Sequence, residues 1–397
     1  MIQVIRHWSF RVFLAAFLSG SVTAKAQQQI ETAGSTWYGE ALAAGDGLVA
    51  VGSEASDFVD VYRRSADGWQ MDGRVLATDG NSFGYRAALG GDWLAIANRD
   101  IAVSGWPNYV DLFRRNGGNW SFVQRVATPN ALPFDSGYIH KMVVGADSLV
   151  VSLVRYGAEG EIAGYSTWYY DYAGGTWSAA RQLLSPYVQR WFGVGLSMDG
   201  DRLAVADLAA PISSGYGAAS VYRRIGGTWM HTATLVSPQP SQLAFGLDVA
   251  LCGKRLAVTA TPLSNQPLPR SNRIFLYAGE DIVWGADGPP LLSPLPSASQ
   301  FDERFGTKLA CSHEALATRA NLRSTVHAVS LTGERTIQQL TVAQASYSAG
   351  DTIAVHGGDV LVADHWGPEG PGPGLDHRGL VFAFNGAVDS IFVQGFE

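Results

Sequence analysis

The chain has 397 residues, a formal net charge of −7, 46 glycines and 11% aromatic residues, while only 16% of its residues are charged. This composition suits short strands and tight turns, because aromatic side chains favour strands and glycine favours turns. The sequence shows no basic cluster, and an acidic surface repels nucleic acid, so no nucleic-acid partner is expected.

The first 26 residues are typical of a secretory signal peptide. Arg6 and Arg11 lead into the apolar run 12–18, and Ala24-Lys25-Ala26 precedes a cleavage site before Gln27. The run is shorter than the roughly 20 residues that span a bilayer, and no later segment comes close. We expect a secreted, periplasmic or cell-surface protein with no membrane span in its mature chain. Removing three basic residues leaves 25 basic and 35 acidic side chains, a net charge of −10.

One pattern recurs seven times in residues 27–397. Six copies start with an aromatic residue, usually in Phe-Gly, and the seventh has Gly350 in its place. Nine residues later stands Asp or a polar substitute, and Leu follows two residues beyond that. The repeats start near 37, 83, 138, 192, 245, 305 and 350, and their Leu residues are Leu48, Leu94, Leu149, Leu203, Leu256, Leu316 and Leu361. The spacing of 45 to 60 residues is close to the length of a four-stranded propeller blade. The sequence therefore predicts a single all-β domain, a seven-bladed β-propeller with four antiparallel strands per blade.

Each repeat also predicts its own hairpins. Gly-Asp at 45–46, 91–92, 200–201 and 358–359 marks a tight turn between the first two strands. In five repeats the third strand carries an aromatic residue with a Trp seven residues later, and we expect the two to face each other across strands three and four and to be buried between blades. These pairs are Tyr62/Trp69, Phe113/Trp120, Tyr170/Trp177, Tyr222/Trp229 and Tyr277/Trp284. In the last repeat, Phe384 and Ile391 keep this spacing, which predicts that the tail Val388 to Phe396 is the fourth strand of blade seven; a detachable sorting tail is the alternative.

The repeat resembles the FG-GAP family, whose units build the integrin α-subunit propeller and many exported bacterial proteins. The likeness lies in Phe-Gly, then Gly-Asp-x-Leu-Ala-Val, then a strand such as Ala219-Ser220-Val221-Tyr222, and it covers nearly all of residues 37–386. The resemblance implies a seven-bladed propeller with an extracellular binding or adhesion function. The ending Ile391-Phe392-Val393-Gln394-Gly395-Phe396-Glu397 is similar to a short C-terminal motif of exported proteins in some gammaproteobacteria.

Many FG-GAP units hold calcium in an Asp-x-Asp-x-Asp-Gly loop, because this cation needs several closely spaced oxygen ligands. No such run occurs here, since Asp199-Gly200-Asp201 is too sparse. We therefore expect no calcium or other cofactor, and no metal site.

The two cysteines, Cys252 and Cys311, lie in the first strands of repeats five and six. When the repeats are superposed, Cys252 matches Ser312 and Cys311 matches Leu251, which are neighbouring positions that point to opposite faces. Adjacent blades pack face to face, so a disulfide is geometrically allowed, and an exported protein permits it. The sequence leaves two alternatives, a disulfide between these cysteines and two buried free thiols.

Departures from the repeat are the best sequence guide to a binding surface, because binding loops escape a scaffold's pattern. Four irregular segments stand out: 213–218, 264–272, 285–304 and 366–375. They and their surroundings contain the candidate ligand-binding residues Tyr216, Trp284, Trp366, His365 and His377. His356 and Asp364 lie near the last two, and these residues are either a metal or acid/base site or ordinary solvated loop groups.

The leading hypothesis is a propeller, expected to be a monomer, that binds a protein or glycan through loops on one rim. No catalytic motif is found, and the alternative is a secreted hydrolase or lyase on a propeller scaffold. Two or more carboxylates with a His or Tyr around the central channel would favour the enzyme. Arg63-Arg64, Arg114-Arg115 and Arg223-Arg224 are interpreted as hairpin-end residues that stack on Trp rather than as a ring that binds anions.

Overall fold

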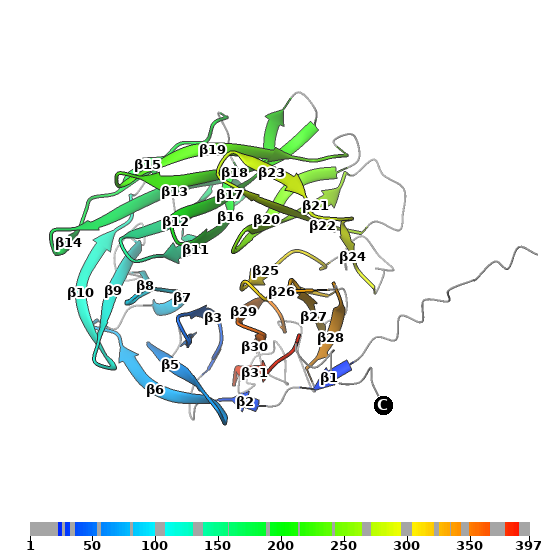
Figure 1. Cartoon of the computed structure of the whole chain (residues 1–397). Coiled ribbons are helices and arrows are strands. Elements are labelled where there is room, and N and C mark those ends of the chain that lie inside the picture. Colours follow the sequence, from blue (N-terminus) through cyan, green and yellow to red (C-terminus); the bar gives the residue numbers. More distant parts are fainter. Residues whose placement is uncertain are drawn as a thin grey trace, which may run out of the picture.

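The chain forms seven antiparallel sheets with four strand positions each, and the sheets follow one another around a ring in the order of the repeats (Figure 1). The predicted seven-bladed β-propeller is confirmed. The computed structural model describes residues 23–25, 28–31, 36–53, 57–79, 82–99, 108–129, 138–157, 159–187, 191–212, 215–239, 243–263, 271–294, 304–320, 325–333, 335–342, 349–365 and 378–388.

The four strand positions of a blade run from the central channel outwards. The innermost strands are β3 (Ala41–Gly45), β7 (Ser82–Gly90), β11 (Ile139–Val144), β16 (Phe192–Asp199), β20 (Leu243–Cys252), β25 (Leu309–Cys311) and β29 (Thr352–His356). The second strands are β4 (Leu48–Ser53), β8 (Trp93–Arg99), β12 (Ser148–Tyr156), β17 (Arg202–Ile212), β21 (Arg255–Pro262), β26 (Ala315–Arg319) and β30 (Asp359–Asp364).

The third and fourth strands complete each sheet on its outer side. The third strands are β5 (Phe58–Ser65), β9 (Asn108–Asn116), β13 (Ile162–Ala173), β18 (Gly215–Ile225), β22 (Arg273–Glu280), β27 (Thr325–Ser330) and β31 (Leu380–Phe384). The fourth positions hold β6 (Gly68–Leu76), β10 (Asn119–Ala127), β14 (Thr176–Trp177) with β15 (Arg181–Leu183), β19 (Thr228–Val236), β23 (Val283–Ala286) with β24 (Leu291–Leu292), β28 (Ile337–Thr341) and β2 (Gln28–Ile30).

Hydrophobic packing between blades holds the ring together. In the described part of the chain, each of the seven interfaces between neighbouring blades has its own buried apolar cluster, including the interface that joins blade seven to blade one. The repeated Leu is at most 2% exposed in every blade, as the repeat predicts. Burying one such side chain contributes roughly 1.5–3 kcal/mol, so the repeat concentrates stabilising residues at the interfaces.

The Trp residues of the repeat pack at these interfaces, but they do not stand directly opposite their aromatic partners. Trp69 pairs with Arg64 and Trp229 pairs with Arg224, so each Trp faces the residue two positions beyond the aromatic. A two-residue hairpin loop fixes this register. The expectation of directly facing rings is therefore wrong. Aromatic and Trp are diagonal neighbours on one face of the sheet.

This register explains the Arg pairs. The second Arg of each pair forms an ion pair with an Asp of the preceding blade, and the three pairs are Arg64–Asp359 at 2.5 Å, Arg115–Asp72 at 2.7 Å and Arg224–Asp171 at 2.6 Å. Arg115 and Arg224 also lie over Trp120 and Trp229, at 5.9 and 5.8 Å from the ring centres. These second Arg residues join blades, in agreement with their interpretation as structural residues.

The ring closes with the N-terminal strand. β2 pairs antiparallel with β31 and occupies the fourth position of blade seven. Ile30 is 3% exposed in the cluster between blades seven and one, and the Gln28 amide donates to the Trp69 carbonyl at 2.6 Å and accepts from the Trp69 N–H at 2.7 Å. The expectation that Val388 to Phe396 is the fourth strand is therefore wrong for this position. Val388 is a buried turn residue, and residues 389–397 lie outside the described part of the chain.

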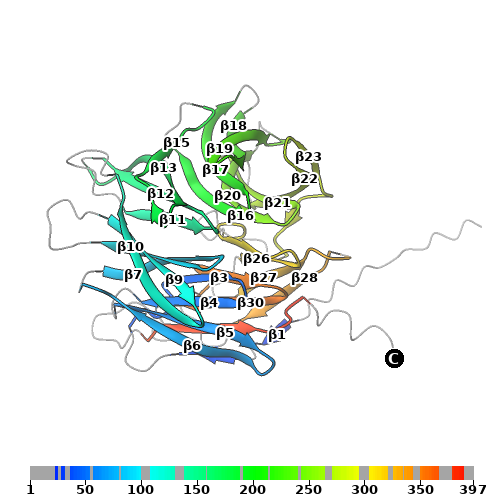
Figure 2. The same ribbon diagram turned by 60° about the vertical axis from the view of Figure 1, so that its left-hand side comes forward.

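Figures 1 and 2 both place blades six and seven beside blade one, where the chain returns to its start. Blade six has the shortest inner strand, since β25 spans three residues. An additional strand, β1 (Thr23–Lys25), lies parallel to β28 on the outside of this blade. Each blade thus retains four strands without β1.

Candidate functional site

A cavity of about 430 Å³ opens at one end of the central channel. Its volume lies in the range of roughly 300–1,000 Å³ of small-ligand sites. We call it the mouth cavity, and its lining residues are Glu40, Ala41, Leu42, Arg86, Ala87, His140, Lys141, Met142, Asp248, Lys308, Leu309, Asp351, Thr352, Ile353 and His365. Most of them lie at or before the N-terminal halves of the inner strands.

The strand ends that the irregular segments join lie at the same rim as the mouth cavity. Neighbouring strands of a blade are antiparallel, so the rim where an inner strand begins also carries the connection from strand two to strand three and the connection to the next blade. Segments 264–272 and 366–375 join second to third strands, and 285–304 leads from blade five to blade six. The 213–218 segment joins β17 to β18, which extend to Ile212 and from Gly215.

Five of the six Asp, Glu, Lys and Arg residues in the lining, all except Asp351, share one place in the repeat. The third residue after the aromatic position is Glu40, Arg86, Lys141, Asp248 and Lys308 in repeats one, two, three, five and six. Repeat four has Gly195, whose added Cβ would lie 2.8 Å from the Asp248 carboxylate. The Asp248 side chain therefore has room only because the equivalent residue of repeat four is a glycine, which has no side chain. Because this position faces the channel in each of the five repeats, its charged side chains line one cavity.

Asp248 anchors the acidic side of the mouth cavity. Its side chain is 2% exposed and binds the Lys141 ammonium at 2.5 Å. It also accepts the N–H groups of Val249 and Leu309, each at 3.0 Å. A buried carboxylate is stable when such partners satisfy it. These bonds connect blades three, five and six at the channel.

Arg86 and Lys308 have no carboxylate partner among the described residues. Arg86 donates to the backbone carbonyls of Tyr85 at 2.6 Å and His140 at 3.2 Å. No hydrogen bond or ion pair of Lys308 occurs in the part of the chain that the structure describes. Burial, followed by repulsion from Lys141, lowers the pKa of Lys308 to about 8, although Asp248 opposes this change.

His140 is a neutral donor in this site. Its Nε2 lies 3.1 Å from the Val194 carbonyl, which can only accept, so Nε2 carries the proton. Burial, followed by the nearby Lys141 and Lys308 ammonium groups, lowers the pKa of His140 to about 3. A base this weak is a poor proton acceptor at neutral pH.

The remaining acidic groups of the cavity are Glu40 and Asp351. Asp351 forms an ion pair with Arg319, and its side chain is still 38% exposed. His365 is half-buried beside them, and burial lowers its pKa while Asp351 and Asp364 act in the opposite direction. The mouth cavity thus combines three carboxylates, two histidines and three cationic side chains from different blades.

Farther along the channel the walls become apolar or small. A second cavity of about 230 Å³ is lined by all seven inner strands, mainly by Ala, Leu, Val and Met side chains. Charged side chains therefore line the mouth cavity and are absent from the lining of the second one.

The structure brings one sequence-predicted ligand residue, His365, to the mouth cavity. Trp284 lies instead on the outer strand β23, where its Nε1 donates to the Asp281 carbonyl at 3.0 Å. Tyr216 is on β18, opposite Pro211, with its side chain outside the described part of the structure. Trp366 and His377 also lie outside the described residues.

The structure separates His356 from His365. His356 ends β29 at the opposite rim and packs edge-on against Trp69, with ring centres 5.9 Å apart. Among the described residues, no three His, Cys, Asp or Glu side chains are grouped to hold a metal ion. The described part of the chain also contains no helix that could cross a membrane.

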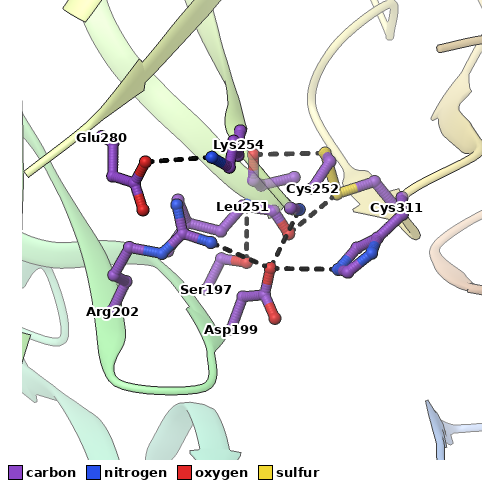
Figure 3. A network of polar contacts seen from close by, with 11 residues as sticks. Ser197, Asp199, Arg202, Leu251, Cys252, Lys254, Glu280 and Cys311 are labelled. Atoms are coloured by element: carbon purple, nitrogen blue, oxygen red, sulfur yellow. Dashed lines mark hydrogen bonds and ion pairs between the residues drawn. A yellow bond between two sulfur atoms is a disulfide. The ribbon is translucent and has the colours of Figure 1, made fainter. Parts of the chain in front are cut away.

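The cysteines form a disulfide at the other end of the inner strands. Cys252 and Cys311 join blades five and six, with Cα atoms 5.6 Å apart. Figure 3 shows the surrounding polar network, in which Asp199 of blade four accepts the Gly253 N–H at 2.9 Å and lies 3.3 Å from His313 of blade six. The disulfide and this network together connect three consecutive blades.

No protein-family model and no curated protein matches the chain. Solved propellers do match in fold. The β-propeller domain of the Trilobed protease from Pyrococcus furiosus aligns with a TM-score of 0.50 at 9% identity over 92% of this chain and 99% of that domain. The Dos1 propeller aligns with a TM-score of 0.45 at 12% identity over 85% of this chain and 75% of that one. An acylaminoacyl peptidase aligns with a TM-score of 0.48 at 10% identity over 81% of this chain and 48% of that one. At 9% identity, the alignment with the Trilobed protease domain shows the propeller fold alone.

Proposed function

We propose that this protein is an exported propeller of the FG-GAP type that binds a macromolecular ligand, a protein or a glycan, through one rim. The observation that carries the proposal is the position of the mouth cavity on the rim that bears the irregular connections. A rigid scaffold that presents variable loops around a polar depression is typical of a binding surface.

Two features support export. The closing strand β2 begins at Gln28, directly after the expected cleavage site between Ala26 and Gln27, so cleavage would leave all seven blades with four strands. The Cys252–Cys311 disulfide suits an oxidising compartment.

Binding is tested with purified residues 27–397 on glycan arrays and in pull-down experiments, with and without a chelator. In one variant, Gly-Ser linkers of equal length replace 264–270 and 367–374. In the control variant, a Gly-Ser insertion lengthens the Gly226-Gly227 turn on the opposite rim. We expect the first change to weaken binding at least tenfold and the control to retain it. Equal affinity of both variants would contradict the rim proposal, and chelator-sensitive binding would contradict the expectation of no calcium.

A second candidate function is hydrolysis or elimination at the mouth cavity. The observation that favours it is the group of Glu40, Asp248 and Asp351 beside two histidines and Lys308. With a pKa of about 8, Lys308 is closer than His140 to the range suited to proton transfer near neutral pH. Incubation with any ligand found on the arrays, followed by mass spectrometry, separates the two functions, because only an enzyme would convert the ligand.

A further inference from the structure

We propose that the Lys308 amine forms an imine with a small hydroxylated aldehyde that enters the mouth cavity. This inference goes beyond the binding of a macromolecule at the rim, because it assigns a covalent reaction to one residue of the cavity. The reaction needs no oxidant or reductant. Nζ forms a bond to the carbonyl carbon, both protons of the neutral amine end on the carbonyl oxygen, and this oxygen leaves as water; hydrolysis reverses the step.

The first observation is how rarely the chain uses lysine. It contains 24 arginines and four lysines, and one of the four, Lys25, lies in the expected signal peptide. Of the remaining three, Lys141 and Lys308 occupy the same position in the repeat and line the mouth cavity. Arginine supplies a positive charge at this position in repeat two, as Arg86. A guanidinium stays protonated in proteins, whereas a lysine amine can lose its proton and react.

The backbone on both sides of Lys308 is held by hydrogen bonds. Two residues before it, the Gly306 N–H donates to the Thr318 hydroxyl at 2.9 Å. Directly after it, the Leu309 N–H donates to the Asp248 carboxylate at 3.0 Å. A reactive side chain acts best when rigid elements present it to the ligand. The Lys308 side chain therefore reaches the cavity from a fixed base.

The cavity does not neutralise the Lys308 ammonium. The Asp248 carboxylate already binds Lys141 at 2.5 Å and the N–H groups of Val249 and Leu309, and within the described residues Lys308 has no ion pair or hydrogen bond. Burial, followed by repulsion from Lys141, lowers the pKa of Lys308 to about 8. At pH 7.5 roughly a quarter of an amine with this pKa is neutral, compared with about one part in a thousand at the ordinary lysine pKa of about 10.4. Burial beside a second cation is an established way to activate a lysine nucleophile.

The lining indicates an uncharged, polar ligand. Its Asp, Glu, Lys and Arg side chains carry three negative and three positive formal charges, so it has no net formal charge with which to select an ion. The Thr352 hydroxyl and the partly exposed Asp351 carboxylate line the same cavity, and ligand hydroxyls can donate to either. The cavity volume of about 430 Å³ is many times the roughly 30 Å³ that one water molecule occupies. A three-carbon hydroxyaldehyde therefore fits within the described walls.

The experiment is reductive trapping. Residues 27–397 are incubated with D-glyceraldehyde at pH 7.5, the imine is reduced with sodium cyanoborohydride, and peptide mass spectrometry locates the modified amines. These residues contain three lysines and one α-amino group, so each site is resolved separately. We expect Lys308 to be labelled at least tenfold faster than Lys254, which is 76% exposed and paired with Glu280. Propanal, which has no hydroxyl groups, should show a smaller preference for Lys308 over Lys254.

A second measurement needs neither an aldehyde nor a variant. Trace labelling with acetic anhydride across pH 6 to 11 reports the neutral fraction of each amine. The charged or titratable groups that act on the Lys308 amine are Lys141, Asp248, Arg86, Asp351 and His140, and Glu40 and His365 share the lining. Labelling of Lys308 should rise to half its maximum at about pH 8, because the amine loses its proton there.

The variant Lys141→Gln tests the arrangement of the two lysines. It removes the repulsion on Lys308 and releases the Asp248 carboxylate, so it raises the pKa of Lys308, and trapping of Lys308 at pH 7.5 should slow about tenfold. Lys254→Gln is the matched control and should leave the rate at Lys308 unchanged, because it removes an exposed lysine from the opposite rim. Thermal melting checks that both variants fold.

Four results would overturn the proposal: trapping of Lys308 no faster than that of Lys254, half-maximal acetylation of Lys308 near pH 10, equal rates at Lys308 in the two variants, or a preference for Lys308 that propanal shares. The first three reject the nucleophile, and the fourth rejects the hydroxylated class of ligand. Because every arm uses a small reagent, the outcome does not depend on whether the rim binds a glycan or a protein.

Discussion

His327 is fully buried in β27, and in the described part of the structure neither of its ring nitrogens has a hydrogen-bond partner. Burial lowers its pKa to about 4, from about 6.5 in an unfolded chain. The unfolded state therefore takes up a proton before the folded state does. Stability is fully present above pH 6.5 and falls as the pH drops towards 4, by about 3 kcal/mol for this residue.

We therefore expect His327→Leu to gain stability relative to wild type as the pH falls from 7 to 4.5. Urea unfolding at several pH values measures this difference. Gln338→Leu is the control, since Gln338 is also a buried polar residue of blade six and does not titrate. A constant difference between His327→Leu and wild type across this range would reject the argument.

At the same scale, the sequence predicted which residues form the core better than it predicted the site. The Leu two residues past the turn is buried in all seven blades because its position depends only on local strand alternation. A charged residue stands three positions after the aromatic position in five repeats. That these residues line one cavity depends on how the blades are arranged around the channel, which the repeat does not specify. His365 was predicted as a ligand residue and lies at the cavity, whereas Arg86, Lys141, Asp248 and Lys308 were missed.

Among the elements, blade six has the shortest inner strand of the ring. Its inner strand β25 has three residues, β26 and β28 have five each, and its repeat lacks the Trp that packs against the preceding blade in blades one to five. The Cys252–Cys311 disulfide joins this short inner strand to the ten-residue β20 of blade five. A covalent bond thus connects the shortest inner strand of the ring to the longest one.

The double variant Cys252→Ser, Cys311→Ser should consequently lose stability. The cysteines are 59 residues apart, and closing a loop of this length corresponds to about 4 kcal/mol in the chain-entropy model. Differential scanning calorimetry should show a lower melting temperature for the variant, and wild type treated with dithiothreitol should melt in the same range. Hydrogen exchange should increase first in blade six. Identical melting of reduced and oxidised wild type would show that the bond adds no stability.

For the whole molecule, the repeats predicted the number and order of blades but not how the ring closes. The number of blades follows from seven copies of a local pattern, because each copy can be recognised in the sequence without the others. Closure depends on a single three-residue strand, Gln28–Ile30, which has no repeat to mark it. In the C-terminal tail, Phe384 and Ile391 keep the spacing of the repeat, which predicts a fourth strand there. The strand that pairs with β31 is instead β2, from the N-terminal end of the chain. A spacing argument cannot choose between two termini that compete for one edge.

Closure by β2 makes Ile30 and Gln28 important for the stability of the entire ring. Ile30→Asp would place a carboxylate in the apolar cluster between blades seven and one, and a buried unpaired charge is strongly unfavourable. We expect it to lower the melting temperature by more than 10 °C, and Gln28→Ala to lower it less, by removing the two hydrogen bonds to Trp69. Gln29→Ala is the matched control, because the Gln29 side chain is exposed and, among the described residues, its hydrogen bond is to the neighbouring Glu31. A chain that ends at Val388 keeps every described strand and should melt close to wild type. If that truncation were as destabilising as Ile30→Asp, the C-terminal tail and not β2 alone would hold the ring closed.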